Sequence, residues 1–177
     1  MDVFFEQILK KKKTATEIAA VAAVYGAGLL IGCVIVFSII KFLPNFFLLG
    51  LMIAGLIFFG AIKLAANFNV EYEYSVTLGS FDIAKIVNKS RRSRLISAEI
   101  STFDDFGLYD EKKLSGKTFD EKVIAVADGT KPIYYATLRH PRKGRVLVLF
   151  QPENRILEEA VNYLPYQLRV KFKKESV

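Results

Sequence analysis

The chain has 177 residues and a formal net charge of +7, and 52% of its residues are hydrophobic. Its one cysteine, Cys33, and one histidine exclude a disulfide framework and a zinc site, which needs several such ligands. Nucleic acid is not the expected partner, because residues 70–177 spread 19 Lys and Arg and 15 Asp and Glu over the whole segment. Attraction to an anionic inner leaflet explains this mild basic excess at least as well.

Residues 1–14 form a short basic amphipathic segment. Five apolar residues could lie on one side of a helix: Val3, Phe4, Phe5, Ile8 and Leu9. Four lysines follow them: Lys10, Lys11, Lys12 and Lys13. Such a helix could rest in the membrane interface with its basic end on anionic headgroups. The alternative is a disordered tail whose lysines only set the topology, and the sequence leaves both open.

Two long apolar runs, Ile18–Ile40 and Phe46–Ile62, predict a transmembrane helical hairpin over residues 15–66. About 20 helical residues cross a hydrocarbon core about 30 Å thick, so helices at about 16–40 and 44–66 would both span it. The runs are too long for a core helix of a soluble protein. A cleaved signal peptide is not expected either, because a second run follows at once.

Basic residues predict the orientation of this hairpin. Lys10 to Lys13 precede the first run and Lys63 closes the second, whereas the connecting turn offers only Lys41. The positive-inside rule then places both termini in the cytoplasm of a multi-pass cell-membrane protein.

Small residues predict how the two helices pack. Gly28 and Gly32 form one small-xxx-small pair, and Gly50 and Ala54 form another. Packing within one chain is the default, and a homodimer is the alternative that is not favoured. A channel or pump is disfavoured, because the ionisable residues Glu17, Lys41 and Lys63 all lie near helix ends.

After Asn67 the pattern changes to strands. Residues 70–77 alternate apolar and polar, and further strand patterns occupy 81–87, 95–100, 122–127, 133–138 and 146–150. Asp128-Gly129 predicts a hairpin turn between two of them. An apolar stripe after Pro152 predicts one helix that ends near Pro165. Residues 70–165 are therefore expected to form six or seven antiparallel strands closed by a C-terminal amphipathic helix.

A basic tail, residues 166–177, follows. Leu168, Val170 and Phe172 alternate with basic residues, which predicts either an extra edge strand or a stripe resting on the bilayer.

Several segments carry a resemblance to a known family. They are EYEYSVT (71–77), FDI (81–83), RRSRLI (91–96), ATLRHPRKG (136–144) and FQPE (150–153). Their order resembles bacterial membrane proteins in which two helices precede a pleckstrin-homology-like (PH-like) domain, in particular an uncharacterised family of small Gram-positive membrane proteins. The resemblance spans nearly the whole chain. It implies a membrane α+β fold, a transmembrane hairpin followed by a PH-like antiparallel β-barrel or sandwich, but no assigned activity.

Phosphoinositide-binding members of the wider fold use a long basic loop between their first two strands. The corresponding turn, Leu78-Gly79-Ser80, is short and uncharged. The resemblance therefore does not extend to phosphoinositide binding at that loop.

Catalysis, cofactors and bound metals are not expected. The only histidine, His140, lies in a turn before a proline, and the only cysteine lies in the first apolar run. The acidic pairs Asp104-Asp105 and Asp110-Glu111 lack the spaced oxygen ligands of a calcium loop. We interpret them as solvated loop residues.

Two basic clusters are the candidate contacts for acidic lipid headgroups or a protein partner. The first comprises Lys89, Arg91, Arg92 and Arg94. The second comprises Arg139, Arg142 and Lys143, with Arg145 beside them. The alternative for each is a solvated hairpin tip whose charge discourages edge pairing. The sequence thus favours a non-enzymatic, membrane-tethered binding module. The alternative is a structural subunit or assembly factor of a larger membrane complex with a membrane-protein partner.

Overall fold

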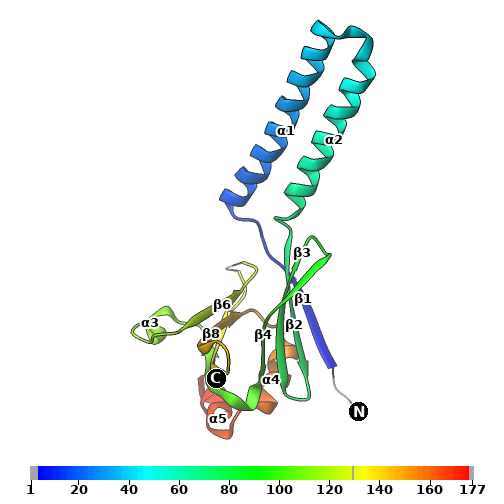
Figure 1. Ribbon diagram of the computed structural model, residues 1–177. Helices are drawn as coiled ribbons and strands as arrows, with labels where there is room; N and C mark the ends of the chain where they lie inside the picture. Colours follow the sequence, from blue (N-terminus) through cyan, green and yellow to red (C-terminus); the bar gives the residue numbers. More distant parts are fainter. Residues whose placement is uncertain (1–3, 129, 176–177) are drawn as a thin grey trace. The chain divides into compact units, whose positions relative to one another are not determined.

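The computed structural model describes residues 4–128 and 130–175. The chain forms two compact units, a helical hairpin within Lys13–Val70 and a β-domain built from the segments on both sides of it (Figure 1). Residues 1–3 of the predicted amphipathic segment, Gly129 of the predicted hairpin turn and residues 176–177 of the predicted tail lie outside the described residues.

The hairpin consists of α1 (Ala15–Phe42), the 3₁₀ helix η1 (Pro44–Phe46) and α2 (Phe47–Ala66). Thr14 begins α1 with a capping box. Its Oγ1 accepts a hydrogen bond from the Glu17 N–H, and the Glu17 carboxylate accepts one from the Thr14 N–H. Pro44 begins η1 because proline suits a first helical turn but cannot continue α1.

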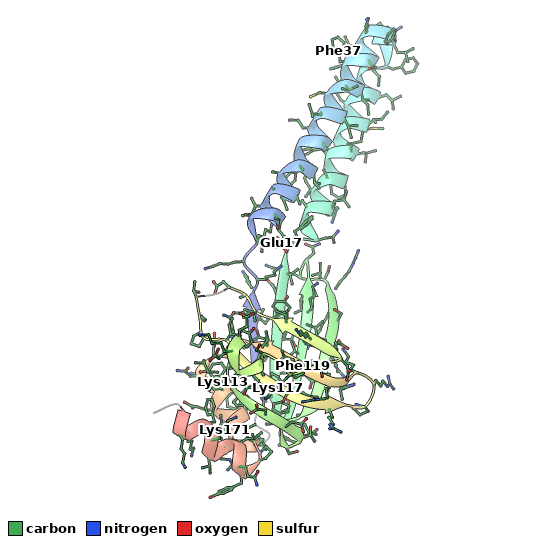
Figure 2. All side chains as sticks on the ribbon, turned by 90° about the vertical axis from the view of Figure 1, so that its left-hand side faces the viewer. Glu17, Phe37, Lys113, Lys117, Phe119 and Lys171 are labelled. Atoms are coloured by element: carbon green, nitrogen blue, oxygen red, sulfur yellow. The ribbon has the colours of Figure 1, made fainter. Side chains whose placement is uncertain are left out.

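The hairpin exposes most of its large apolar side chains. Phe37 is 69% exposed and Leu48 is 79% exposed, and Figure 2 shows Phe37 projecting away from the helices. A core helix of a soluble protein would bury such residues. By length and composition, both helices are long and apolar enough to cross a membrane.

Small residues lie where α1 and α2 meet. A Cβ atom at Gly28 would come within 2.9 Å of the Ala61 Cβ, and one at Gly50 within 3.0 Å of an isoleucine of α1. The same atom at Gly32 would lie 3.5 Å from the Ala54 Cβ. The predicted packing residues Gly28, Gly32, Gly50 and Ala54 are thus placed at this contact.

The β-domain contains two four-stranded sheets among the described residues. In spatial order, sheet A consists of β1 (Phe4–Lys10), β2 (Val70–Thr77), β3 (Ser80–Val87) and β4 (Arg91–Glu99). Sheet B consists of β5 (Phe103–Leu108), β7 (Tyr134–His140), β8 (Gly144–Phe150) and β6 (Glu121–Ala125). The helices are η2 (Ile100–Thr102), α3 (Glu111–Leu114), α4 (Asn154–Tyr163) and α5 (Tyr166–Glu175).

Strand β1 corrects the prediction for the N-terminal segment, because Phe4–Lys10 is neither an interfacial helix nor a disordered tail. It pairs antiparallel with β2, from Phe4↔Thr77 to Lys10↔Glu71. Gln7 lies opposite the fully buried Tyr74 and is itself buried. The segment becomes a strand because it pairs with β2. This partner follows the whole helical hairpin in the sequence, so a local pattern cannot reveal it.

The predicted hairpin across Asp128-Gly129 is wrong. β6 pairs in parallel with β8, from Glu121↔Val146 to Ala125↔Phe150. β7 pairs with β8 on its other side and with β5. Strand β8 is buried on both faces, so its backbone needs partners along both edges, and β6 supplies the second edge.

Aromatic residues fill the core between the sheets. The ring centroids of Phe81 and Phe150 are 5.0 Å apart, and those of Phe106 and Phe150 are 6.2 Å apart. Tyr74 meets Phe150 edge-on at 6.1 Å. The other face of sheet B has a smaller apolar cluster, formed by Leu114, Tyr135, Leu147 and Leu149. The β-domain therefore has its own hydrophobic core.

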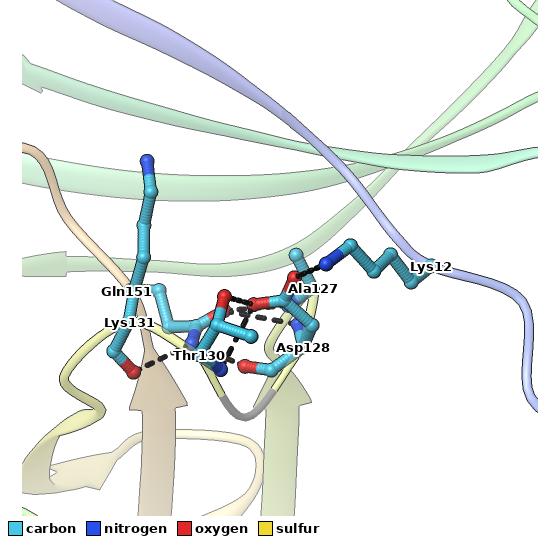
Figure 3. Close-up of polar contacts among 6 residues, drawn as sticks. All are labelled: Lys12, Ala127, Asp128, Thr130, Lys131 and Gln151. Carbon is cyan, nitrogen blue, oxygen red and sulfur yellow. Dashed lines mark hydrogen bonds and ion pairs between the residues drawn. The ribbon is translucent and has the colours of Figure 1, made fainter.

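Gln151, which is 1% exposed, is the centre of a polar network (Figure 3). Its Oε1 accepts hydrogen bonds from the N–H groups of Ala127 (2.8 Å) and Asp128 (3.3 Å). Its Nε2 donates to the carbonyl groups of Asp128 and Lys131. Lys12 joins this loop through its N–H, which donates to the Ala127 carbonyl at 3.1 Å. One buried amide thus fastens the loop between β6 and β7.

Tyr74 extends this network into the core. Its hydroxyl donates to the Ala125 carbonyl and accepts a hydrogen bond from the Gln151 N–H at 3.3 Å. Burial raises the pKa of Tyr74, so the phenol remains protonated in its role as a donor.

The C-terminal segment also differs from the strand that was predicted as one alternative, because residues 166–175 form helix α5. Phe172 packs on Phe106 and Tyr134, with ring centroids 5.3 and 6.2 Å apart. The alternation of apolar and basic residues indicated a strand. Leu168 and Phe172 are four residues apart, however, so they also lie on one face of a helix. The helix is favoured because it packs Phe172 against the aromatic rings of sheet B.

Asp105 ties α5 to sheet B. Its carboxylate accepts hydrogen bonds from Lys171 (2.8 Å), Tyr135 (2.9 Å) and Lys117 (3.2 Å); both lysines are labelled in Figure 2. Burial alone would raise the pKa of Asp105, but these donors, Lys171 first, outweigh it and lower the pKa. Asp105 therefore favours the docked helix in its ionised form.

We expect Lys171→Met to destabilise the β-domain by about 1 kcal/mol at neutral pH, a typical value for a partly exposed ion pair. A lowered folded-state pKa stabilises above the ordinary value of about 3.9, and this stabilisation is lost as pH falls through the lower value. The difference between variant and wild type should therefore shrink below about pH 4. Urea unfolding of the full chain in detergent, followed by near-ultraviolet circular dichroism, measures it.

Lys173→Met is the matched control, because Lys173 is exposed on the same helix and has no ion pair among the described residues. It should cost almost nothing at either pH. An equal loss for Lys171→Met at neutral and acidic pH would contradict the role given to Asp105.

Candidate functional site: a basic sheet end and a charged groove

One end of sheet A gathers basic residues from two separate segments. β1 ends there at Lys10, paired with Glu71 near the start of β2. The turn between β3 and β4, residues 88–90, lies at the same end, because Val87 pairs with Arg91 and β3 runs back along β2. We call this end, with Lys10, Lys89 and Arg91, the basic end; Lys11 to Lys13 follow Lys10 along the chain. The chain leaves it for both apolar helices, through residues 11–14 and 67–69.

The side chains at the basic end differ in their partners. Lys89 and Arg91 are exposed and make no ion pair within residues 4–128 and 130–175. Lys12 pairs with Asp128 at 2.6 Å and, with hydrogen bonds from Thr130, holds the pKa of that carboxyl at about 2. Lys89 adopts a positive φ of 53° in the turn. The turn at residues 88–90 therefore presents two cations, Lys89 and Arg91, to solvent. In the lysine run, the charge of Lys12 is compensated by Asp128.

The other two arginines of the first cluster face acids across the sheet. Arg92 pairs with Glu73 of β2, and Arg94 Nε lies 3.6 Å from Asp82 Oδ1 of β3. These four residues, with Ser75 and Ala84, line a groove of about 540 Å³ on the outer face of sheet A. We call it the charged groove. The sequence had grouped Arg92 and Arg94 with Lys89 and Arg91 as one surface, and the structure divides them.

Glu73 and Asp82 were missed by the sequence analysis. Glu73 is only 5% exposed although it alternates with core residues on β2. A cross-strand arginine shields its carboxylate, and such a partner is set by the register of β3 with β4. The only sequence signal was the Glu-Tyr-Glu-Tyr alternation, which predicted a half-buried strand.

The second cluster surrounds the turn between β7 and β8. Lys143 Nζ donates to the Leu95 carbonyl at 2.9 Å and to Glu121 at 2.6 Å, so it holds β4 against sheet B. The Arg145 guanidinium lies 5.8 Å from the centre of the Phe119 ring. Arg139 and Arg142 are exposed. Lys143 is thus placed in a structural contact, whereas the arginines remain available to solvent.

The remaining predicted residues lie outside both clusters. Lys63 lies in the last turn of α2, with its Nζ 5.3 Å from the centre of the Phe59 ring. His140 Nδ1 accepts a hydrogen bond from the Arg142 N–H at 3.2 Å. Within the part of the chain that the structure describes, no three His, Cys, Asp or Glu residues gather as metal ligands.

Comparison with known families decides the fold relationship. Residues 1–170 match the model of a family described as "Bacterial PH-like domain (DUF6106)". The chain belongs to this family. No curated protein and no solved structure matches it. Membership confirms the resemblance drawn from the sequence and the predicted fold class, two apolar helices followed by a PH-like β-domain with a helical C-terminus. It carries no ligand or activity to this chain.

Within this PH-like domain, the turn between β2 and β3 consists of Leu78 and Gly79, both at positive φ. It bears no charge. The residues of the basic end lie at the opposite end of β2, where the chain connects to the helices.

Proposed function

We propose that this protein is a membrane-anchored, non-enzymatic module whose PH-like domain docks its basic end on anionic lipid headgroups. The single observation that carries the proposal is that Lys10, Lys89 and Arg91 lie at the same end of sheet A. That end is also where the chain leaves for both apolar helices. In this proposal the helices span the cell membrane and both termini are cytoplasmic.

The energetics support docking. A basic residue near an anionic leaflet contributes about 1 kcal/mol, so Lys89, Arg91 and the lysine run together exceed thermal energy several-fold. The connections to the helices, residues 11–14 and 67–69, are short. Tethering on short connections raises the effective concentration of headgroups at this end and converts docking into an intramolecular step.

The test uses nitroxide labels on the full chain in nanodiscs that contain anionic lipid. The lone Cys33 is first replaced by serine, and single cysteines are placed at Ser90, in the turn of the basic end, or at Ser101, beyond the other end of β4. Strand β4 has nine residues, which extend about 30 Å at about 3.3 Å each. A headgroup-anchored nickel chelate should relax the label at residue 90 strongly and the label at residue 101 weakly.

Both sites are exposed, so a soluble nickel chelate, which should relax both labels alike, is the control for accessibility. Stronger relaxation by the anchored chelate at residue 101 than at residue 90 would overturn the proposed orientation of the domain.

A second function, a structural subunit of a larger membrane complex, is favoured by the outer surface of the hairpin. A Cβ added at Gly26, Gly55 or Gly60 would meet nothing within 4 Å. These small positions are not used in the packing of α1 on α2 and could receive helices of a membrane-protein partner. Co-purification of one stoichiometric membrane protein, lost when Gly55 is replaced by leucine, would favour this function.

A further inference from the structure

We propose that the charged groove binds the zwitterionic headgroup of an aminophospholipid, with the phosphate on Arg92 and Arg94 and the primary ammonium on Asp82. The inference rests on the proposed function, because it names the lipid chemistry taken beside the basic end. Arg92 follows directly after Arg91, and Glu73 pairs with Ile8, two residues before Lys10. The groove therefore begins at the end of the sheet that is proposed to meet the bilayer.

Asp82 provides the acceptor. Its side chain is 31% exposed, and its Oδ1 is buried without a hydrogen-bond donor. Arg94 Nε, at 3.6 Å, lies beyond hydrogen-bonding distance. An ionised carboxylate only accepts hydrogen bonds, and a ligand can reach the exposed part of this one and not the buried Oδ1. A ligand with N–H groups would donate hydrogen bonds to the exposed part of the carboxylate.

Arg92 and Arg94 provide the donors. Their side chains are 64% and 73% exposed, although each has an acid beside it. A guanidinium has five N–H donors in a planar fork, and a single ion pair leaves most of them available. Glu73, whose side chain is 6% exposed, holds Arg92 against the sheet. Guanidinium forks positioned in this way match the oxygen atoms of a phosphate.

The shape and the charge of the groove select the ligand class. The small side chains of Ser75 and Ala84 leave a hollow of about 540 Å³ between the charged residues, within the range of about 300–1,000 Å³ typical of small-molecule sites. Two acids and two arginines make the groove neutral as a whole. A phosphate joined to a primary ammonium complements both signs, whereas a simple anion would leave Asp82 without a donor.

The experiment compares ligands of equal charge, one with and one without N–H donors. Backbone amide shifts of Ser75 and Ala84 are recorded by NMR on the full chain in nanodiscs of phosphatidylcholine with added phosphatidylethanolamine. Soluble O-phosphoethanolamine and phosphocholine are titrated in a second arm, on the full chain in a phosphate-free detergent. A trimethylammonium group has no N–H, so the choline compounds cannot donate to Asp82.

The expected result is a shift with the ethanolamine compound and little with the choline compound. Shifts in both arms would show that the free headgroup is sufficient, and shifts in nanodiscs alone would show that the intact lipid is required. Asp82→Asn should weaken the response at least about tenfold, equivalent to about 1.4 kcal/mol. Glu99 is an exposed acid on β4 outside the groove, and Glu99→Gln should leave the response unchanged.

Equal responses to ethanolamine and choline, or no response to either, would overturn the proposal. So would an unchanged response of Asp82→Asn. These lipids carry no net charge, so the outcome is separate from the docking of the basic end on anionic lipid. Failure here leaves the proposed function standing, and failure of the label experiment leaves this groove testable with soluble ligands.

Discussion

Gln151→Leu is expected to destabilise the PH-like domain by about 3 kcal/mol, because it keeps the volume of the side chain and removes all its hydrogen bonds. Two N–H groups and two carbonyl groups of the loop at residues 127–131 would lose their partner. Each buried polar group left unpaired costs about 1–3 kcal/mol, and partial access of the loop to water keeps the total below the sum. Urea unfolding of the full chain in detergent measures the change.

Gln167→Leu is the matched control. Gln167 is exposed at the start of α5, and a surface substitution of this kind normally changes stability by less than about 0.5 kcal/mol. If Gln151→Leu were as mild as this control, the buried amide would not fasten the loop between β6 and β7.

The same network makes the PH-like domain depend on β1, which precedes the helical hairpin in the sequence. Gln7 of β1 donates to the Gln151 carbonyl at 3.2 Å and accepts from the Glu153 N–H at 2.7 Å. A fragment that starts after the hairpin loses these bonds and the partner of β2.

The helical hairpin could be predicted from the sequence because length and composition alone determine whether a helix can cross a bilayer. Strands β2 and β3 were also predictable, since residues 70–77 alternate apolar and polar side chains and a short turn follows them. Strand β5 (Phe103–Leu108) was not expected as a strand. β1 was not predictable, because 59 residues separate Lys10 from Val70, where its partner strand begins, and its own pattern suits a helix equally well. Leu168 and Phe172 fit a strand or a helix, and only the buried Phe106 decides between them.

The site shows a similar division. The positive charge of Lys89 and Arg91 was evident, and their place at the connected end of sheet A follows from the strand order. The pairing of Arg92 with the buried Glu73 depends on register across three strands. Register is a property of the assembled sheet, so the charged groove could not be predicted from charge runs in the sequence.

The central claim, electrostatic docking of the basic end, is tested most directly by charge reversal. The double variant Lys89→Glu, Arg91→Glu changes the local charge by four units at about 1 kcal/mol each, before screening by salt. We expect the docking equilibrium constant in anionic nanodiscs to fall about 100-fold, about 2.7 kcal/mol. The fraction of the residue-90 label relaxed by headgroup-anchored nickel reports that constant.

The matched control, Lys112→Glu with Lys173→Glu, makes the same change of net charge at exposed positions on α3 and α5. The account predicts that the control docks like wild type in anionic nanodiscs and that neither variant matters in neutral ones. Docking that survives reversal of Lys89 and Arg91, or that falls equally in the control, would contradict it.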